Sequence, residues 1–220
     1  MDIQENLERI RGLVPSGVEI VAVSKFHPAE MIMQAYEAGQ RVFGESRVQE
    51  LLQKEEALPK DIRWHFIGHL QTNKVKALIG KTYLIESVDS ERLLALIDKE
   101  SENAGIQTQV LLQVHVAQEE TKFGFLPEEL LEFIESGAYN QYKSVRLCGL
   151  MGRASNTTDI ERVKHDFHRI KELYDEISHK TKDSLPYFNY ISMGMSGDWP
   201  VAVEEGANIV RIGSAIFGER

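Results

Sequence analysis

The stretch Ile20-Val21-Ala22-Val23-Ser24-Lys25 is a β-rich apolar run that ends on a lysine. A continuous apolar strand is buried on both faces, which is typical of a parallel sheet in an α/β protein. Ligands of α/β folds bind at the carboxyl ends of such strands. Partial desolvation at that position can lower the pKa of a lysine enough for its amine to attack a carbonyl and form an imine. A solvated lysine that simply ends the strand is the alternative for this stretch alone.

The composition is that of a globular chain with an acidic balance. Of 220 residues, 42% are hydrophobic and 27% charged, and the formal net charge is −9. This charge argues against a nucleic-acid backbone or an anionic membrane as a partner. The single cysteine, Cys148, cannot form an internal disulfide, which favours a reducing compartment. Because the N-terminus does not resemble a signal peptide and no apolar run reaches membrane-spanning length, the sequence predicts a cytoplasmic protein.

Strand-like and helix-like patterns alternate along the whole chain. The stripe of Ile3, Leu7 and Ile10 predicts an opening helix. Strands are predicted at residues 19–25, 41–44, 64–68, 83–88, 108–116, 145–151, 187–193 and 208–212. Amphipathic helical patterns separate them, and Thr158 with Glu161 has capping-box spacing before the longest one. This alternation predicts a single (β/α)8 TIM-type barrel domain over residues 1–220 with an extra N-terminal helix, and an open doubly wound sheet is the alternative.

In a barrel, the carboxyl ends of the strands converge on one mouth. The residues expected there are Lys25, Glu45-Ser46, Gly68-His69, Ser87, His115, Met151-Gly152, 193–196 and 211–214. The glycine-rich segments 192–198 and 211–215 follow the last two strands, where barrels commonly hold a phosphate. The hydroxyl groups of Ser196 and Ser214 would donate hydrogen bonds to the phosphate. The alternative is that these glycines only form tight turns.

Arg211 interrupts the apolar run of the last strand. Burying an arginine is costly unless it points into the mouth and meets a phosphate, a carboxylate or a ring nitrogen. A phosphate site beside the strand-end Lys25 suggests a phosphorylated carbonyl ligand held as an imine, and pyridoxal phosphate fits that description. A cofactor-free Schiff-base aldolase with Lys25 as its nucleophile is an alternative.

Other motifs have simpler explanations. His65 and His69 lie on a strand and at its exit, so they share no helical face, and His165 with His168 lies on the polar flank of a helix. The sequence therefore predicts no metal site. Cys148 lies in the middle of a strand and is expected in the core.

The sequence resembles the pyridoxal-phosphate homeostasis proteins, which are relatives of the alanine racemase barrel. The matching stretches are residues 21–25 (VAVSK), 43–45 (FGE) with 48–50 (VQE), 64–74 (WHFIGHLQTNK), 149–151 (GLM), 192–196 (SMGMS) with Asp198, and 210–218 (VRIGSAIFG). They follow in order along nearly the whole chain, and the stretches 64–74 and 210–218 are the most specific.

The resemblance implies that pyridoxal phosphate is the cofactor. The cofactor-binding residues expected from it are Lys25, Ser46, Met193, Ser196, Arg211, Gly213 and Ser214. Lys25 would form the aldimine, Ser196, Gly213 and Ser214 would hold the phosphate, and Arg211 would face the pyridine nitrogen. An arginine there keeps that nitrogen unprotonated and weakens the ring as an electron sink.

The resemblance also implies a carrier rather than an enzyme. The chain ends at residues 218–220, just after the last strand, without the C-terminal β domain that dimerises racemases and supplies a second catalytic base. The expected function is therefore intracellular pyridoxal phosphate homeostasis by a monomer without turnover of its own, with PLP-dependent apoenzymes as candidate partners. A PLP-dependent racemase or other amino-acid enzyme is the first alternative, and the aldolase is the second.

The sequence departs from the family pattern at residues 26–27, at residues 46–47 and in the loop 118–124, which keeps only the Lys-x-Gly element. Phe26-His27 replaces the small polar residue that more often follows the lysine. Ser46 stands where asparagine is usual, and Arg47 stands where an aromatic residue is frequent. None of these departures replaces Lys25 or a residue of the expected phosphate site.

Overall fold

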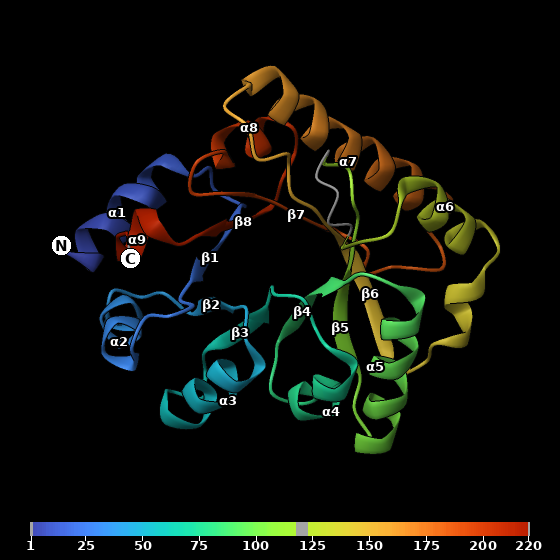
Figure 1. Ribbon diagram of the computed structural model, residues 1–220, viewed down its shortest axis with the longest axis horizontal. Helices are drawn as coiled ribbons and strands as arrows, with labels where there is room; N and C mark the ends of the chain where they lie inside the picture. Colours follow the sequence, from blue (N-terminus) through green and yellow to red (C-terminus); the bar gives the residue numbers. More distant parts are fainter. Residues whose placement is uncertain (1, 118–122, 220) are drawn as a thin grey trace.

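The computed structural model describes residues 2–117 and 123–219, and within them eight parallel strands close into a barrel in chain order (Figure 1). The strands are β1 Glu19–Val23, β2 Val42–Glu45, β3 Arg63–Phe66, β4 Leu84–Val88, β5 Thr108–Gln113, β6 Val145–Met151, β7 Tyr190–Met195 and β8 Ile209–Ile212. The barrel closes where β8 pairs with β1, with Val21 opposite Arg211. The predicted (β/α)8 barrel is confirmed.

Helices surround the strands. They are α1 Ile3–Leu13, α2 Ala29–Glu37, α3 Val48–Ala57, α4 Val75–Leu78, α5 Glu91–Ala104, α6 Pro127–Glu135, α7 Ile160–Lys180, α8 Trp199–Glu204 and α9 Ser214–Phe217, with short 3-10 helices at Thr72–Lys74 and Ala138–Gln141. The predicted N-terminal helix is α1, and its stripe of Ile3, Leu7 and Ile10 is buried. None of the helices in the described part of the chain has the length and apolar character needed to cross a membrane.

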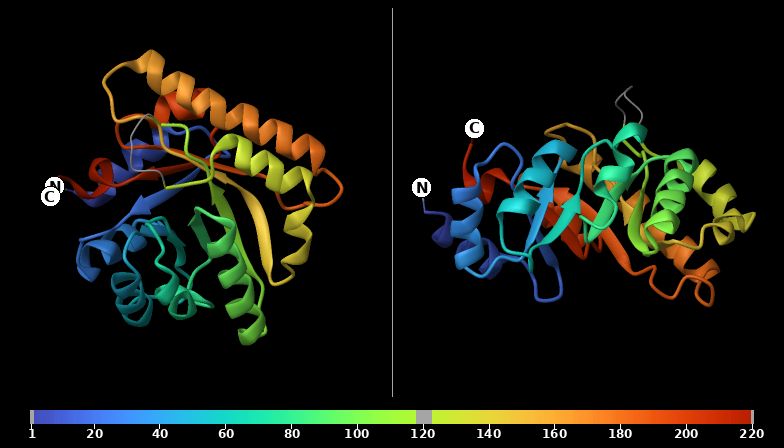
Figure 2. Two further views of the ribbon diagram at one scale, coloured as in Figure 1. Left: turned by 45° about the vertical axis from the view of Figure 1, so that its right-hand side comes forward. Right: turned by 90° about the horizontal axis from the view of Figure 1, so that it is seen from below.

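The two ends of the described chain lie on the same side of the barrel (Figure 2). There α1 packs against α9, and the Asn6 side-chain amide donates to the Ile216 carbonyl at 3.0 Å. The sequence did not predict α9, because a four-residue helix is too short to have a periodic pattern. The prediction for α7 is also corrected. Asp159, not Thr158, is its N-cap, and the Asp159 carboxylate accepts from the N–H groups of Glu161 and Arg162.

Buried apolar side chains form two groups. The larger one fills the space between strands and helices. The smaller one consists of Val21, Val42, Leu84, Leu111, Cys148, Met151 and Ile209, which confirms the core position of Cys148. Side chains two residues apart share a strand face, so Ile209 shares its face with Arg211, and Leu84 shares its face with Glu86. The smaller group therefore lies inside the barrel, with polar residues above it toward the carboxyl ends of the strands.

Candidate functional site

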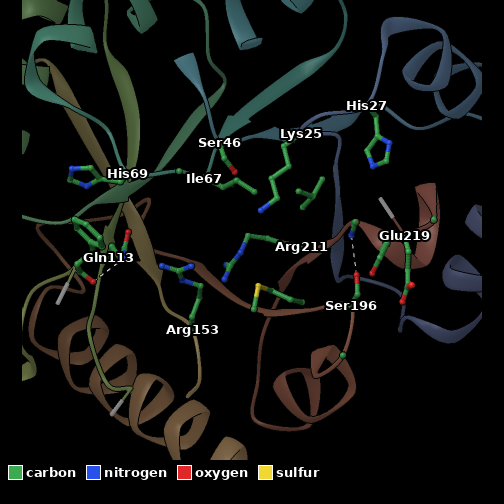
Figure 3. Close-up of a pocket in the computed structure, with 18 residues that line it drawn as sticks. Lys25, His27, Ser46, Ile67, His69, Gln113, Arg153, Ser196, Arg211 and Glu219 are labelled. Carbon is green, nitrogen blue, oxygen red and sulfur yellow. Dashed lines mark hydrogen bonds between the residues drawn. The ribbon is translucent and has the colours of Figure 1, made fainter. Parts of the chain in front are cut away.

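A cavity of about 690 Å³ lies at the carboxyl ends of the strands (Figure 3). The structure brings together in its lining every residue predicted to bind the cofactor except Met193. These are Lys25, Ser46, Ser196, Arg211, Gly213 and Ser214. Met193 is fully buried in the apolar layer between strands and helices, and Met195 lines the cavity in its place.

There is a local reason why Met195, rather than Met193, lines the cavity. β7 begins at Tyr190 rather than at the predicted residue 187 and continues to Met195. Its pairing with β8 shifts register between Ser192 and Met195, so the alternation of side chains is broken there. Gly194 lies in this irregular segment with φ +91°, and a Cβ atom on it would come within 2.6 Å of the Ala202 Cβ. A side chain at this position is therefore excluded by both conformation and space.

Lys25 directly follows β1, and its side chain extends into the cavity toward Arg211 (Figure 3). Ser46 follows β2 on the same side of the cavity. The Ser46 carbonyl lies so close to Gly68 that a Cβ atom there would be 2.1 Å from its oxygen. Glycine at position 68 thus lets the segments after β2 and β3 approach each other and fixes where Ser46 lies.

The segments that follow β7 and β8 meet at the predicted phosphate site. The Gly213 N–H donates to Ser196 Oγ at 3.1 Å, and the Ser196 hydroxyl keeps its own proton to donate. Asp198 precedes α8, as expected for a cap, but its carboxylate accepts from the Met195 N–H at 2.5 Å instead of from the helix. That bond closes the turn that presents Ser196.

Arg211 is buried, with 4% of its surface exposed, and it is held from two sides. Its Nη2 donates to the Gly152 carbonyl at 2.8 Å, and its Nη1 donates to Ser192 Oγ. Its Nη1 also lies 3.6 Å from Glu86 Oε2. Burial lowers the pKa of Arg211, while the negative charge of Glu86 acts in the opposite direction. Because a guanidinium keeps its proton at ordinary pH, Arg211 still places a fixed cation at the inner end of the cavity.

Glu86 connects Arg211 to a buried histidine. Ser192 Oγ donates to Glu86 Oε2, and Glu86 Oε1 lies 2.6 Å from His65 Nδ1. Both Glu86 and His65 are completely buried. Burial by itself would raise the pKa of Glu86, but the hydrogen bond and charge of His65, the charge of Arg211 and the Ser192 bond outweigh it and lower that pKa. The barrel interior thus contains a chain of paired polar groups that ends at the cavity.

Sequence reasoning did not identify Glu86, His65 or Lys54, each of which is buried. A signal was available for Glu86, because it interrupts the apolar run of β4 as Arg211 interrupts that of β8. Two opposite charges in two buried strands have to be paired. The sequence did not show that those two strands present them to each other.

The charge of the cavity lining favours an anionic ligand. Lys25, Arg211 and Arg153 contribute positive charges, and Glu219 contributes a negative one. Arg153 was not predicted, and it lies beside Arg211 in Figure 3. Among the other expected mouth residues, His115 lines an adjoining cavity of about 890 Å³ and Ser87 is buried.

The fold is a closed (β/α)8 barrel. The site is a cationic cavity with a lysine at the end of the first strand, which suits an anionic ligand. Residues 1–220 match the family described as alanine racemase, N-terminal domain. The pyridoxal phosphate homeostasis protein of Aquifex aeolicus is 44% identical over 219 residues, which cover 99% of this chain and 93% of the relative. The Schizosaccharomyces pombe protein of the same name is 40% identical and covers 92% of this chain and 84% of its own length. The chain therefore belongs to the alanine racemase N-terminal domain family, within the group of the pyridoxal phosphate homeostasis proteins.

Solved structures agree with this assignment. PipY of Synechococcus elongatus with PLP bound has a TM-score of 0.88 and 35% identity, covering 98% of this chain and all of PipY. PipY without PLP has a TM-score of 0.91. Alanine racemase of Clostridium difficile shares the fold, with a TM-score of 0.79 at 18% identity over 100% of this chain and 57% of the racemase chain. The resemblance seen in the sequence is thus confirmed.

Proposed function

We propose that this chain binds pyridoxal phosphate in the cavity of Figure 3 as a Schiff base with Lys25 and helps to control the supply of that cofactor. The observation that carries the proposal is the convergence of Lys25, Arg211 and the two serine-containing segments on one cavity. The chain is also 35% identical, over nearly its whole length, to a protein solved with PLP bound.

The residues present fit the cofactor. The cavity of about 690 Å³ has a volume usual for small-molecule sites. Lys25 would hold the aldehyde carbon, Ser196, Gly213 and Ser214 the phosphate, and Arg211 the pyridine nitrogen. When bound, the cofactor supplies an aldehyde that condenses with an amine, with loss of water, and a conjugated ring that absorbs visible light.

Arg211 supports a carrier without turnover. A guanidinium is a permanent donor that does not release its proton at ordinary pH. Its pairing with Glu86 and its bond to the Gly152 carbonyl hold it in the charged form. A ring nitrogen that faces it accepts a hydrogen bond but no proton, so the ring withdraws electrons weakly. Delivery of the cofactor to PLP-dependent apoenzymes by a cytoplasmic monomer completes the proposal.

The first experiment is a visible absorption spectrum of the purified protein and of Lys25→Ala, before and after borohydride. We expect a yellow wild-type protein whose chromophore is fixed by reduction with a matching mass increase on the Lys25 peptide. Lys25→Ala should fold, by circular dichroism, but form no such adduct. A protein that stays colourless with added pyridoxal phosphate would contradict the proposal, and imine trapping with a sugar phosphate would then favour the aldolase.

Turnover is tested separately on the loaded protein. Single enantiomers of several amino acids are incubated with wild type and Lys25→Ala, and the enantiomer ratio is followed by chiral chromatography. We expect no sustained racemisation. Racemisation through many cycles that disappears in Lys25→Ala would replace the carrier by an enzyme.

A further inference from the structure

Helix α3 contains a buried lysine, Lys54, which contacts the turn that carries Lys25. Lys54, near the end of α3, has only 7% of its surface exposed. Its Nζ donates to the Ser24 carbonyl at 2.8 Å, to Glu45 Oε1 at 2.7 Å and to Glu50 Oε1 at 2.6 Å. An ammonium group has three N–H donors, so these bonds use all of them. One of the bonds reaches the residue just before Lys25.

The two carboxylates bound by Lys54 hold the residues on either side of Lys25. Glu45 Oε1 accepts from the Ser24 hydroxyl at 2.6 Å, and both residues are completely buried. Glu50 Oε1 accepts from the Phe26 N–H at 2.5 Å. The Ser24 side chain and the Phe26 backbone, on either side of Lys25, are therefore tied through one carboxylate each to the same ammonium group.

The turn held in this way is strained. Phe26 has φ +67°, and it is the one residue other than glycine with a positive φ among the described residues. A bulky side chain rarely adopts this conformation unless the surrounding structure imposes it. The bond from the Phe26 N–H to Glu50 and the Arg47 guanidinium, 4.5 Å from the centre of the Phe26 ring, impose it here.

The contact between Phe26 and Arg47 also explains two departures from the family pattern. A large residue follows the lysine where a small polar one is more frequent, and an arginine stands where an aromatic residue is frequent. In the structure the two side chains contact each other, so each departure accommodates the other. Arg47 immediately precedes α3, the helix that carries Glu50 and Lys54.

We propose that Lys54, through Glu45 and Glu50, is the positioning residue for Lys25. The group formed by these three side chains, which we call the α3 clamp, keeps the strained turn in place and so aims the Lys25 amine into the cavity. Arg153, Arg211 and the serine segments bind the ligand, whereas the α3 clamp decides how readily the amine reaches its aldehyde. The physiological meaning of the α3 clamp rests on the proposed function.

The test compares Lys54→Met, Lys54→Arg and Glu50→Ala with wild type. Lys54→Met leaves the buried Glu45 without its cation and can fail to fold, so Glu50→Ala provides a second route. The Glu50 side chain is partly exposed, and its removal leaves the Lys54–Glu45 pair intact. The matched control is Glu55→Ala on the same helix, because Glu55 pairs with Lys60 and Lys81 away from the cavity. Thermal unfolding of each variant identifies those that retain the fold.

The first readout is the rate at which pyridoxal phosphate forms a borohydride-reducible Schiff base. We expect formation to be about tenfold slower in Lys54→Met and Glu50→Ala, because misplacement of a reacting group by about 1 Å costs one to two orders of magnitude. Lys54→Arg should recover most of the rate, and Glu55→Ala should leave it unchanged. Wild-type rates in folded Lys54→Met and Glu50→Ala would overturn the proposal.

The second readout does not use the cofactor. Reductive methylation with formaldehyde and cyanoborohydride, followed by peptide mass spectrometry, gives the reactivity of Lys25 relative to the exposed Lys76. We expect this ratio to rise at least about threefold in folded Glu50→Ala, because a released amine gains contact with solvent and with small reagents. If wild type forms no Schiff base with pyridoxal phosphate, the proposed function fails. The α3 clamp is then judged by this ratio, and an unchanged ratio overturns it.

Discussion

Arg211 on β8 and Glu86 on β4 face each other inside the barrel, with Nη1 3.6 Å from Oε2 and the Ser192 hydroxyl bonded to both. Both side chains are buried, so neither charge is solvated by bulk water. Arg211 lines the cavity that contains Lys25, whereas Glu86 does not. The charge that the cavity presents to a ligand therefore depends on a carboxylate that does not line it.

Removing the charge of Glu86 should destabilise the protein. In Glu86→Gln the amide can still bond Ser192, but Arg211 becomes a buried cation without its counter-charge. Breaking a buried ion pair from one side costs about 3 kcal/mol or more. Urea unfolding should show this loss, while the same change at the exposed Glu30 should have little effect. Equal stability of Glu86→Gln and wild type would mean that the pair contributes nothing.

The same pair predicts an acid dependence of stability. The pKa of Glu86 is lower in the folded protein than its ordinary value of 4.5. A carboxylate with a lowered folded-state pKa contributes stability that is complete above the unfolded-state pKa and is lost as pH falls through the folded-state value. The free energy of unfolding should therefore decrease as the pH is lowered below 4.5. Subtracting the curve of Glu86→Gln from that of wild type isolates this contribution, and parallel curves would contradict it.

The alternation of patterns predicted the barrel, because buried parallel strands and amphipathic helices each have their own period. The positions of Lys25 and Arg211 at the barrel mouth could also be predicted, because a charged residue in or at the end of an apolar strand is visible in one stretch of sequence. The pairing of Arg211 with Glu86 depends on which side chains of β8 and β4 point into the barrel. The pairing of Lys54 with Glu45 depends on which face of α3 packs against the strands. One sequence does not contain that information. The sequence also did not indicate that Met195 rather than Met193 lines the cavity, because the irregular pairing of β7 cannot be read from its apolar pattern.

Gly68 should be intolerant of even a methyl group. An added Cβ would lie 2.1 Å from the Ser46 carbonyl oxygen, and a backbone atom cannot move away as the end of a side chain can. We expect Gly68→Ala to lose about 3 kcal/mol of stability, as overpacking with backbone displacement does. Gly12, in α1, has no atom within 4 Å of its added Cβ. Gly12→Ala should therefore stabilise the protein by about 0.5–1 kcal/mol. Thermal unfolding of both variants tests whether the approach of the two segments is required.

Ser214 should distinguish pyridoxal phosphate from pyridoxal, which lacks the phosphate. A hydroxyl that donates to a phosphate forms a charge-assisted hydrogen bond worth about 1.5–3 kcal/mol. We therefore expect Ser214→Ala to weaken binding of pyridoxal phosphate by about tenfold or more and to leave binding of pyridoxal unchanged. Ser196→Ala should act in the same direction and also loosen the contact between its segment and Gly213, because the Gly213 N–H donates to Ser196 Oγ. Titrations followed by absorbance give both affinities. Equal weakening of the two ligands in Ser214→Ala would assign this residue to the ring or to the fold and move the phosphate elsewhere in the cavity.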